Sequence, residues 1–204
     1  MQSGGAAALS ATGRPEPDPR VDMRRKDRGK DDAWIRDYLR AATWGYLGVV
    51  AEDGQPYVHP NLFVFDEERH CLWVHGYRAG RLRSCVDACD RVVFSAAGMG
   101  RLLPGATALN FSVEYASVVV YGTAHVVPDA EEATHGLRML MEKYAPHLRY
   151  GEDYQGIPAA DLERTAVYRL DIEAWSGKQK EAAGDFPGAY TLPEPPVPFS
   201  GRRG

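Results

Sequence analysis

The chain has 204 residues, of which 44% are hydrophobic and 25% are charged, which predicts one globular domain with tails. The 24 Lys and Arg and 28 Asp and Glu give a net charge of −4, which argues against a general nucleic-acid-binding protein. No apolar run approaches the roughly 18–20 residues of a membrane span.

The cysteines and the N-terminus indicate the cellular compartment. Three cysteines are an odd number and come with no extracellular signal, which argues against a disulfide framework. The Ala-rich patch near the N-terminus has no basic residues before it and is too short for a signal peptide. We therefore expect a cytoplasmic protein with reduced thiols, and neither nucleic acid nor membrane as a partner.

Both ends of the chain differ in composition from the middle. Residues 1–30 are rich in Gly, Ala, Pro and charge and lack apolar periodicity, which predicts disorder for most of them. The basic cluster at residues 23–28 is the expected exception. Residues 184–204 contain five prolines and are predicted to lie as an extended arm over a neighbouring surface. The folded domain is therefore predicted to span residues 31–183.

The middle of the chain reads mainly as strands, because apolar and aromatic residues alternate between short turns. The predicted strands are 43–51, 56–65, 70–75, 91–97, 112–127 and 166–175. The predicted helices are 32–42, 81–88 and one that follows the N-cap Asp129, with Glu132 as its capping-box partner. Residues 98–108 are expected to be a long loop near a ligand or a partner.

The order of these elements predicts the fold class. Consecutive strands joined by hairpins exclude a βαβ alternation, and an antiparallel sheet must close to remove its edges. We therefore predict a mainly β fold, a small antiparallel barrel with flanking helices. The strand 112–127 is apolar on both faces, with Val118 and Val120 on one and Val119 and Tyr121 on the other. One face can fill the barrel, and the other requires a partner, which predicts a two-fold dimer.

The sequence contains no nucleophile elbow, zinc-ligand spacing or nucleotide-binding P-loop. Two other segments carry the candidate chemistry. Residues 73–83 place a strand end, a glycine-bracketed loop and a helix start beside Arg78, Arg81 and Arg83. Helix N-termini and arginine forks both bind phosphate, although a basic surface turn would look the same. In residues 57–62, Pro60 interrupts a strand and frees backbone groups for a planar cofactor edge. An ordinary edge strand is the alternative.

Five motifs in order resemble one known family. They are the basic residues 23–28, Val-His-Pro-Asn at 58–61, Leu-Trp-Val-His-Gly at 72–76 followed by Gly80 and Arg81, the strand 115–124, and Trp-Ser-Gly-Lys at 175–178. Together they resemble the pyridoxamine-phosphate-oxidase-like flavoproteins, the FMN-binding split-barrel group. Within that group the chain is most similar to the branch of the nitroimidazole-resistance (Nim) proteins. The resemblance covers residues 23–190.

This resemblance implies an antiparallel split β-barrel and a homodimer with FMN in two interface clefts. It implies that His59, Pro60, Asn61, Val74 and His75 line the flavin ring, with His75 as a candidate proton or hydrogen-bond donor. It places the 5′-phosphate at Gly80, Arg78, Arg81 and Arg83, because Leu82 stands where many Nim-like proteins have Lys. Trp175 and Lys178 would approach the site from the last strand.

The resemblance implies an FMN-dependent oxidoreductase that acts on a small molecule, with a reduced nicotinamide as candidate electron donor. In such a protein the flavin carries out the electron transfer. Two alternatives remain at this point: a flavin carrier without catalysis, and a split barrel that uses a deazaflavin coenzyme or haem.

Overall fold

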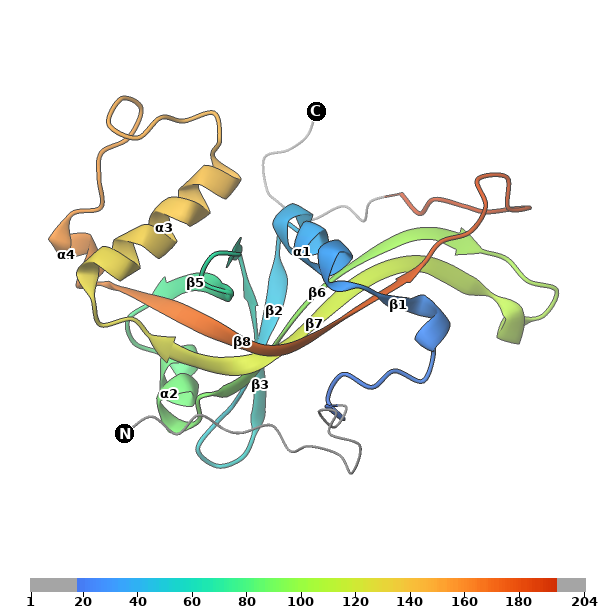
Figure 1. The fold of residues 1–204 in the computed structure, drawn as a ribbon, viewed down its shortest axis with the longest axis horizontal. Helices are drawn as coiled ribbons and strands as arrows, with labels where there is room; N and C mark the ends of the chain where they lie inside the picture. The colour runs from blue at the N-terminus through green and yellow to red at the C-terminus, as the bar shows by residue number, and fades with distance from the viewer. Residues whose placement is uncertain (1–17, 194–204) are drawn as a thin grey trace, which may run out of the picture.

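One antiparallel sheet organises the chain, and its strands follow the order β3-β2-β6-β7-β8-β5-β4, with β1 beside β8. We describe it from a computed structural model, which covers residues 18–193 (Figure 1). The strands are β1 (Gly29–Lys30), β2 (Gly45–Val50), β3 (Pro56–Asn61), β4 (Val64–Asp66), β5 (Cys71–Tyr77), β6 (Arg91–Leu103), β7 (Ser112–Val126) and β8 (Thr165–Lys180). The sheet curls on itself, and the predicted split-barrel fold is confirmed.

The helices flank this sheet. They are α1 (Asp32–Ala41), α2 (Arg81–Ala88), α3 (Ala130–Tyr144) and the short α4 (Ala159–Leu162), with single 3₁₀ turns η1 (Lys26–Arg28) and η2 (Ala108–Asn110). No helix in the range 18–193 is long and apolar enough to cross a membrane.

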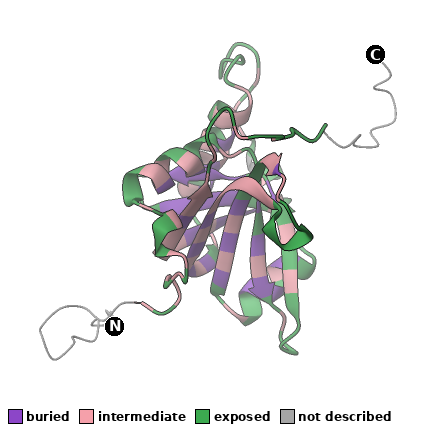
Figure 2. Cartoon of the chain, turned by 90° about the vertical axis from the view of Figure 1, so that its right-hand side faces the viewer, coloured by how far each residue is buried: buried purple, intermediate pink, exposed green. Residues whose placement is uncertain are grey.

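The main core fills the concave side of the sheet. Alternate residues along the strands are buried, as the bands in Figure 2 show. Helices α1 and α2 add apolar side chains to this core, among them Ile35, Leu39 and Val86. The carboxylate of Asp31 caps α1 by accepting a hydrogen bond from the Trp34 backbone N–H (2.9 Å). The sheet and the two helices therefore bury one continuous apolar interior.

A second core lies under α3, on the outer side of β4 and β5. Trp73 is fully buried there together with Cys71 and Leu140. Close approach of α3 depends on Gly136, because a Cβ at that position would lie 2.8 Å from the Trp73 ring. The N-cap of α3 is confirmed, since the Glu132 N–H donates to the Asp129 carboxylate (2.8 Å).

Strands β6 and β7 form a long arm where the sequence predicted a loop. The expected loop at 98–108 is wrong in its first half, because β6 continues to Leu103 and pairs with β7 through the register Leu102↔Val113 and Leu103↔Ser112. Gly98 and Gly100 favour a loop locally, but backbone pairing with β7 and a bulge between Met99 and Leu102 accommodate them in the strand. The arm projects from the barrel (Figure 1).

The predicted strand 56–65 is interrupted. It divides into β3, which pairs with β2, and β4, which pairs with β5 on the other edge of the sheet. The hydroxyl of Tyr144 anchors the crossing, because it accepts a hydrogen bond from the Phe63 N–H (3.0 Å).

The described parts of both predicted tails contact the sheet. Gly29 and Lys30 of β1 pair with β8, and Arg20 donates a hydrogen bond to Glu173 (2.6 Å). At the other end, Tyr190 pairs with Leu102 of the arm. Residues 1–17 and 194–204 lie outside the described residues.

Candidate functional site

The start of α2 lies beside the inner face of the edge strand β3. Gly80, whose φ of +123° favours glycine, turns the chain from the end of β5 into the helix. The Arg81 guanidinium then lies over the ring of Tyr57, with Cζ 5.3 Å from the ring centroid. The structure thus brings the predicted helix start and one of its arginines to β3.

A row of side chains continues from Tyr57 along β3. The Tyr57 and His59 rings meet edge to face with centroids 6.0 Å apart. His59 Nδ1 in turn lies 2.9 Å from the Asn61 amide oxygen, and Asn61 is buried. These residues share one face because they alternate along the strand, and Pro60 points to the other face. We call Arg81, Tyr57, His59 and Asn61 the β3 row.

The Arg81 end of the β3 row borders an open hollow of about 540 Å³. The hollow is lined by Arg81, Ser84 and Cys85 of α2 and, on the side of the β2–β3 turn, by Ala51 and the acidic residues Glu52 and Asp53. Arg81 makes no ion pair with any residue of the range 18–193, so its charge is available to a ligand. Together with the backbone N–H groups at the start of α2, it favours an anion at this end of the row.

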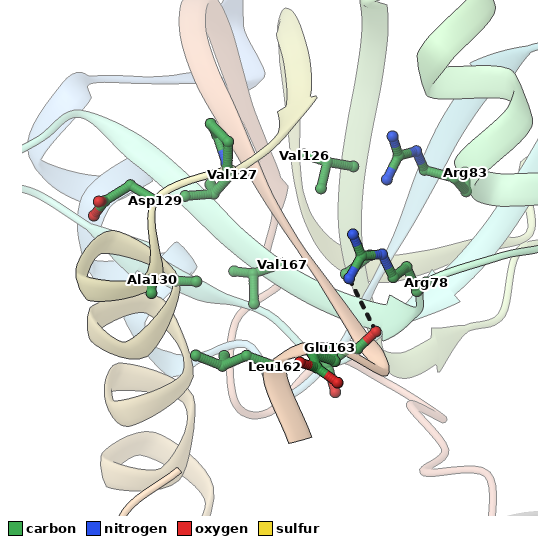
Figure 3. A pocket seen from close by; sticks show the side chains of 13 residues that line it. Arg78, Arg83, Val126, Val127, Asp129, Ala130, Leu162, Glu163 and Val167 are labelled. Carbon is green, nitrogen blue, oxygen red and sulfur yellow. Dashed lines mark hydrogen bonds between the residues drawn. The ribbon is translucent and has the colours of Figure 1, made fainter. Parts of the chain in front are cut away.

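Arg78 and Arg83 lie in a different cavity, of about 410 Å³, between α2, the start of α3 and the start of β8 (Figure 3). Arg78 Nη1 donates to the Glu163 carbonyl (3.0 Å), and Arg83 Nε donates to Asp87 (2.6 Å). Residues two apart on a helix point in nearly opposite directions, which separates Arg83 from Arg81. The three arginines predicted for one phosphate therefore do not converge in this chain.

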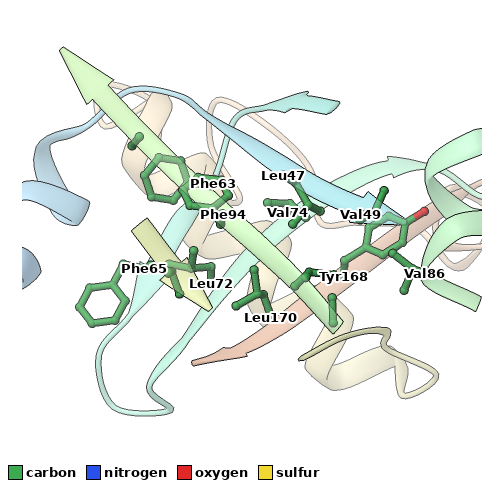
Figure 4. Close-up of a cluster of buried hydrophobic side chains, with 14 of the residues drawn as sticks. Leu47, Val49, Phe63, Phe65, Leu72, Val74, Val86, Phe94, Tyr168 and Leu170 are labelled. Atoms are coloured by element: carbon green, nitrogen blue, oxygen red, sulfur yellow. The ribbon is translucent and has the colours of Figure 1, made fainter. Parts of the chain in front are cut away.

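Val74 and His75 point to opposite sides of β5. Val74 is only 1% exposed and lies in the main core among Leu47, Val86 and Tyr168 (Figure 4). His75 pairs with Val167, so the two side chains lie on the same face of the sheet. Val167 lines the 410 Å³ cavity on that face. Although the His75 side chain reaches the surface, desolvation by the surrounding protein lowers its pKa. Only His75 of this pair is accessible to a ligand.

Trp175 and Lys178 lie near the far end of β8. Trp175 donates to the Asp32 carboxylate (2.9 Å) and lies against His70, with ring centroids 4.8 Å apart. Lys178 follows Val167, which pairs with His75, by eleven residues along β8. At roughly 3.3 Å per residue this is about 36 Å of strand. Within one chain this length of strand separates Lys178 from the start of α2.

Sequence reasoning missed Tyr57, whose ring lies under Arg81, and Ser84, which lines the hollow. The alternation of Tyr57, His59 and Asn61 on one predicted strand was the available signal, since it places three polar or aromatic side chains on one face. Ser84 gave no signal, because a serine one turn into a helix is common.

A family model described as pyridoxamine 5′-phosphate oxidase matches residues 31–179. The chain belongs to the pyridoxamine 5′-phosphate oxidase family. The resemblance inferred from the five motifs is thereby confirmed. No curated protein sequence matches the chain.

Solved structures share the fold of this family member. The flavocytochrome Anf3 from Azotobacter vinelandii matches with a TM-score of 0.70 and 24% identity, over 89% of this chain and 90% of that one. The FAD and heme binding protein from Mycobacterium smegmatis matches with a TM-score of 0.67 and 19% identity, over 76% and 74%. A provisionally assigned 5-nitroimidazole antibiotic resistance protein from Bacteroides thetaiotaomicron matches with a TM-score of 0.61 and 19% identity, over 74% and 89%. At these identities the matches show a common fold.

Proposed function

We propose that this chain binds FMN, with the 5′-phosphate at Arg81 and the start of α2 and the ring system along β3. The observation that carries the proposal is the β3 row, which joins a cation without an ion-pair partner to the half-buried imidazole of His59 and the buried amide of Asn61. The family and the flavins named for two of the similar structures support a flavin as the ligand.

The residues present fit such a ligand. The phosphate carries two negative charges, which a guanidinium and helix N–H groups stabilise. His59 and Asn61 offer an imidazole and an amide at the edge strand, where a planar ring could accept and donate hydrogen bonds. Their mutual 2.9 Å contact fixes the orientation of His59. A bound flavin would supply hydride or electron transfer, and the protein would orient it.

We propose an oxidoreductase acting on a small molecule, with a reduced nicotinamide as electron donor. The 410 Å³ cavity on the His75 side of the sheet supports this role, because it has apolar walls and both cations and carboxylates at its border, namely Arg78, Arg83, Asp129 and Glu163. His75 could hold or release a proton at its imidazole on this side of the sheet, and desolvation, which lowers its pKa, favours the neutral ring.

We further propose a homodimer formed through the outer face of the sheet. Tyr46, Val50 and Val58 are exposed on this face of β2 and β3. On β2, Gly48 lies between Val58 of β3 and Val93 of β6. Val93 in turn lies opposite Tyr121, so the apolar surface continues onto β7. A second copy of the chain would cover this surface and bring further residues towards the β3 row.

The decisive experiment compares FMN with riboflavin, which lacks the phosphate. Arg81→Ala should weaken FMN binding roughly tenfold to hundredfold, because the loss of one charge-assisted hydrogen bond lowers affinity by about that factor. Riboflavin binding should change little. Arg83→Ala is the matched control, because it removes an equal charge from the other side of the same helix. Unchanged FMN affinity in Arg81→Ala, or equal weakening of both ligands, would contradict the proposal.

The absorption spectrum of the purified protein tests the alternatives. Flavin bands support a flavin, which mass analysis of the released cofactor identifies as FMN or not, whereas a haem or deazaflavin spectrum supports the other cofactors. Turnover with a reduced nicotinamide distinguishes an enzyme from a flavin carrier.

A further inference from the structure

Three separate parts of the chain converge on the ring of Tyr115 at the base of the arm. Arg28, just before β1, donates from Nη1 to the Tyr115 hydroxyl oxygen (3.0 Å). Its Cζ lies 5.9 Å from the ring centroid, and Lys178 Nζ on β8 lies 5.7 Å from the same centroid. The pairing of β1 with β8 produces this convergence, because Gly29 is directly opposite Lys178.

The cations at this position are poorly neutralised. The closest carboxylate to Arg28 is that of Asp27 at 4.0 Å, and Asp27 already makes two short hydrogen bonds to Arg25. Lys178 forms no ion pair with a residue of the described chain. Elsewhere the fold neutralises such groups, as where Arg101 pairs with Glu114 at 2.6 Å. Like charges held together without a counterion create a positive potential that an anion would relieve.

The hydroxyl of Tyr115 responds to this potential. Burial raises the pKa of Tyr115, but the hydrogen bond from Arg28 and the charges of Arg28 and Lys178 outweigh burial, so the pKa is lowered overall. The surroundings of this oxygen therefore favour negative charge. Because the oxygen accepts its hydrogen bond from Arg28, the hydroxyl proton is free to be donated to a ligand.

We infer that Arg28, Tyr115 and Lys178 form a second anion site, which takes a phosphate group of a ligand other than the flavin. A planar guanidinium, a flexible ammonium and a neutral hydroxyl donor together match the tetrahedral oxygens of phosphate. The site is distinct from the start of α2 in the same chain, which lies at the opposite end of β8. The phosphates of a nicotinamide dinucleotide and inorganic phosphate share the chemistry that this site would recognise.

Calorimetric titration of the full-length protein with inorganic pyrophosphate tests the site. Arg28→Ala and Lys178→Ala should each weaken pyrophosphate binding roughly tenfold to hundredfold, and Tyr115→Phe should weaken it less. Lys26→Ala is the matched control, because Lys26 lies in the same basic segment, is 83% exposed and pairs with Asp22 instead. Equal weakening by Lys26→Ala would overturn the inference, since it would show only attraction to a basic segment.

A spectroscopic titration provides a second readout. The difference between the phenolate titrations of the wild-type protein and Tyr115→Phe isolates Tyr115, and pyrophosphate should shift its ionisation to higher pH. An unchanged Tyr115 titration at saturating pyrophosphate would overturn the site, even if the alanine variants fold poorly.

Competition identifies the source of the phosphate and separates this site from the flavin site. Displacement of pyrophosphate by NADPH, with the same sensitivity to Lys178→Ala, supports a dinucleotide ligand at this site. Displacement by inorganic phosphate alone supports a free-phosphate site. Loss of bound flavin in Lys178→Ala with unchanged pyrophosphate affinity would overturn the inference and assign Lys178 to the flavin.

Discussion

Lys143 is a half-buried cation on α3 with apolar surroundings. Its Nζ lies 3.9 Å from the centroid of the Phe63 ring and donates to the Leu39 carbonyl (3.3 Å). Burial lowers the pKa of Lys143 from 10.5 to about 8. Between these two values the unfolded chain binds more protons than the folded chain, so stability must rise with pH in that window.

We predict that this rise disappears in Lys143→Met. The wild-type free energy of unfolding should gain about 1–3 kcal/mol relative to the variant between pH 7 and pH 10, allowing for partial solvent screening. Urea unfolding of both proteins at the two pH values measures the difference, and the comparison cancels the titration of other groups. A pH-independent difference between them would show that Lys143 has an ordinary pKa.

The residue scale also shows where sequence reasoning succeeds and fails. The N-cap Asp129 could be predicted, because capping depends on residues three positions apart. The predicted capping-box role of Glu132 is wrong for its side chain, because the Glu132 carboxylate accepts a hydrogen bond from Arg169 on β8 (2.8 Å) instead. Likewise, helical geometry separates Arg81 from Arg83, but only the fold shows which cavity each arginine faces. Contacts between distant segments decide such details.

At the scale of elements, the packing of α3 on β5 depends on Gly136. Alanine favours helices by about 1 kcal/mol over glycine, but its Cβ would lie 2.8 Å from the rigid Trp73 ring. We predict that Gly136→Ala destabilises the protein by about 1–3 kcal/mol through overpacking. Thermal unfolding measures this change. A stabilised Gly136→Ala would mean that α3 can move away from the sheet at little cost.

The arm and the C-terminal segment are joined by one acidic side chain. Glu114 accepts hydrogen bonds from Arg101 (2.6 and 2.9 Å) and from the Ala182 N–H (3.0 Å), and these lower its pKa to about 2. Arg101 also donates to carbonyls of residues 182–184. Glu114 thus holds the segment that leads to Tyr190 against the arm.

We predict that Glu114→Gln releases this segment and leaves the barrel folded. Hydrogen exchange at Ala182 and Tyr190 should become faster, while amides of β2 and β5 stay protected. In the wild-type protein the same release should occur as pH falls from 4.5 towards 2, because a carboxyl with a lowered pKa stabilises the fold only while ionised. Glu181→Gln, one residue before Ala182, is the control and should leave exchange unchanged.

The arm also shows what the sequence could not predict about elements. The turns, the helices α1 and α2 and most strands follow from local alternation and capping. The extension of β6 beyond Ala97 does not, because its glycines favour a loop locally and are overruled by pairing with β7. The division of 56–65 into two strands depends on which edge of the sheet each half joins.

At the scale of the whole molecule, the outer sheet face raises the question of assembly. Strand β7 has the two apolar faces that the sequence predicted: Val118 and Val120 are buried in the core, and Val119 and Tyr121 are half-buried on the outer side.

The motifs predicted the family and the barrel, because both depend on patterns along the chain. The separation between Lys178 and the start of α2 could not be predicted, because it depends on the length of β8 that lies between them.

We predict that Val58→Asp converts a dimer into a monomer without unfolding it. Val58 is 57% exposed in the single chain, so a charge there costs little in the monomer but would be buried without a partner in a dimer. Light scattering at micromolar concentration should give twice the 22.5 kDa chain mass for the wild type and about once that mass for the variant. Because the second copy is proposed to bring further residues towards the β3 row, the variant should also retain less flavin after gel filtration. Leu148→Asp, which places the same charge beyond α3 at a residue 39% exposed, is the control and should remain dimeric. A wild-type protein that is monomeric under these conditions would contradict the dimer, and the apolar outer face would then require a different partner.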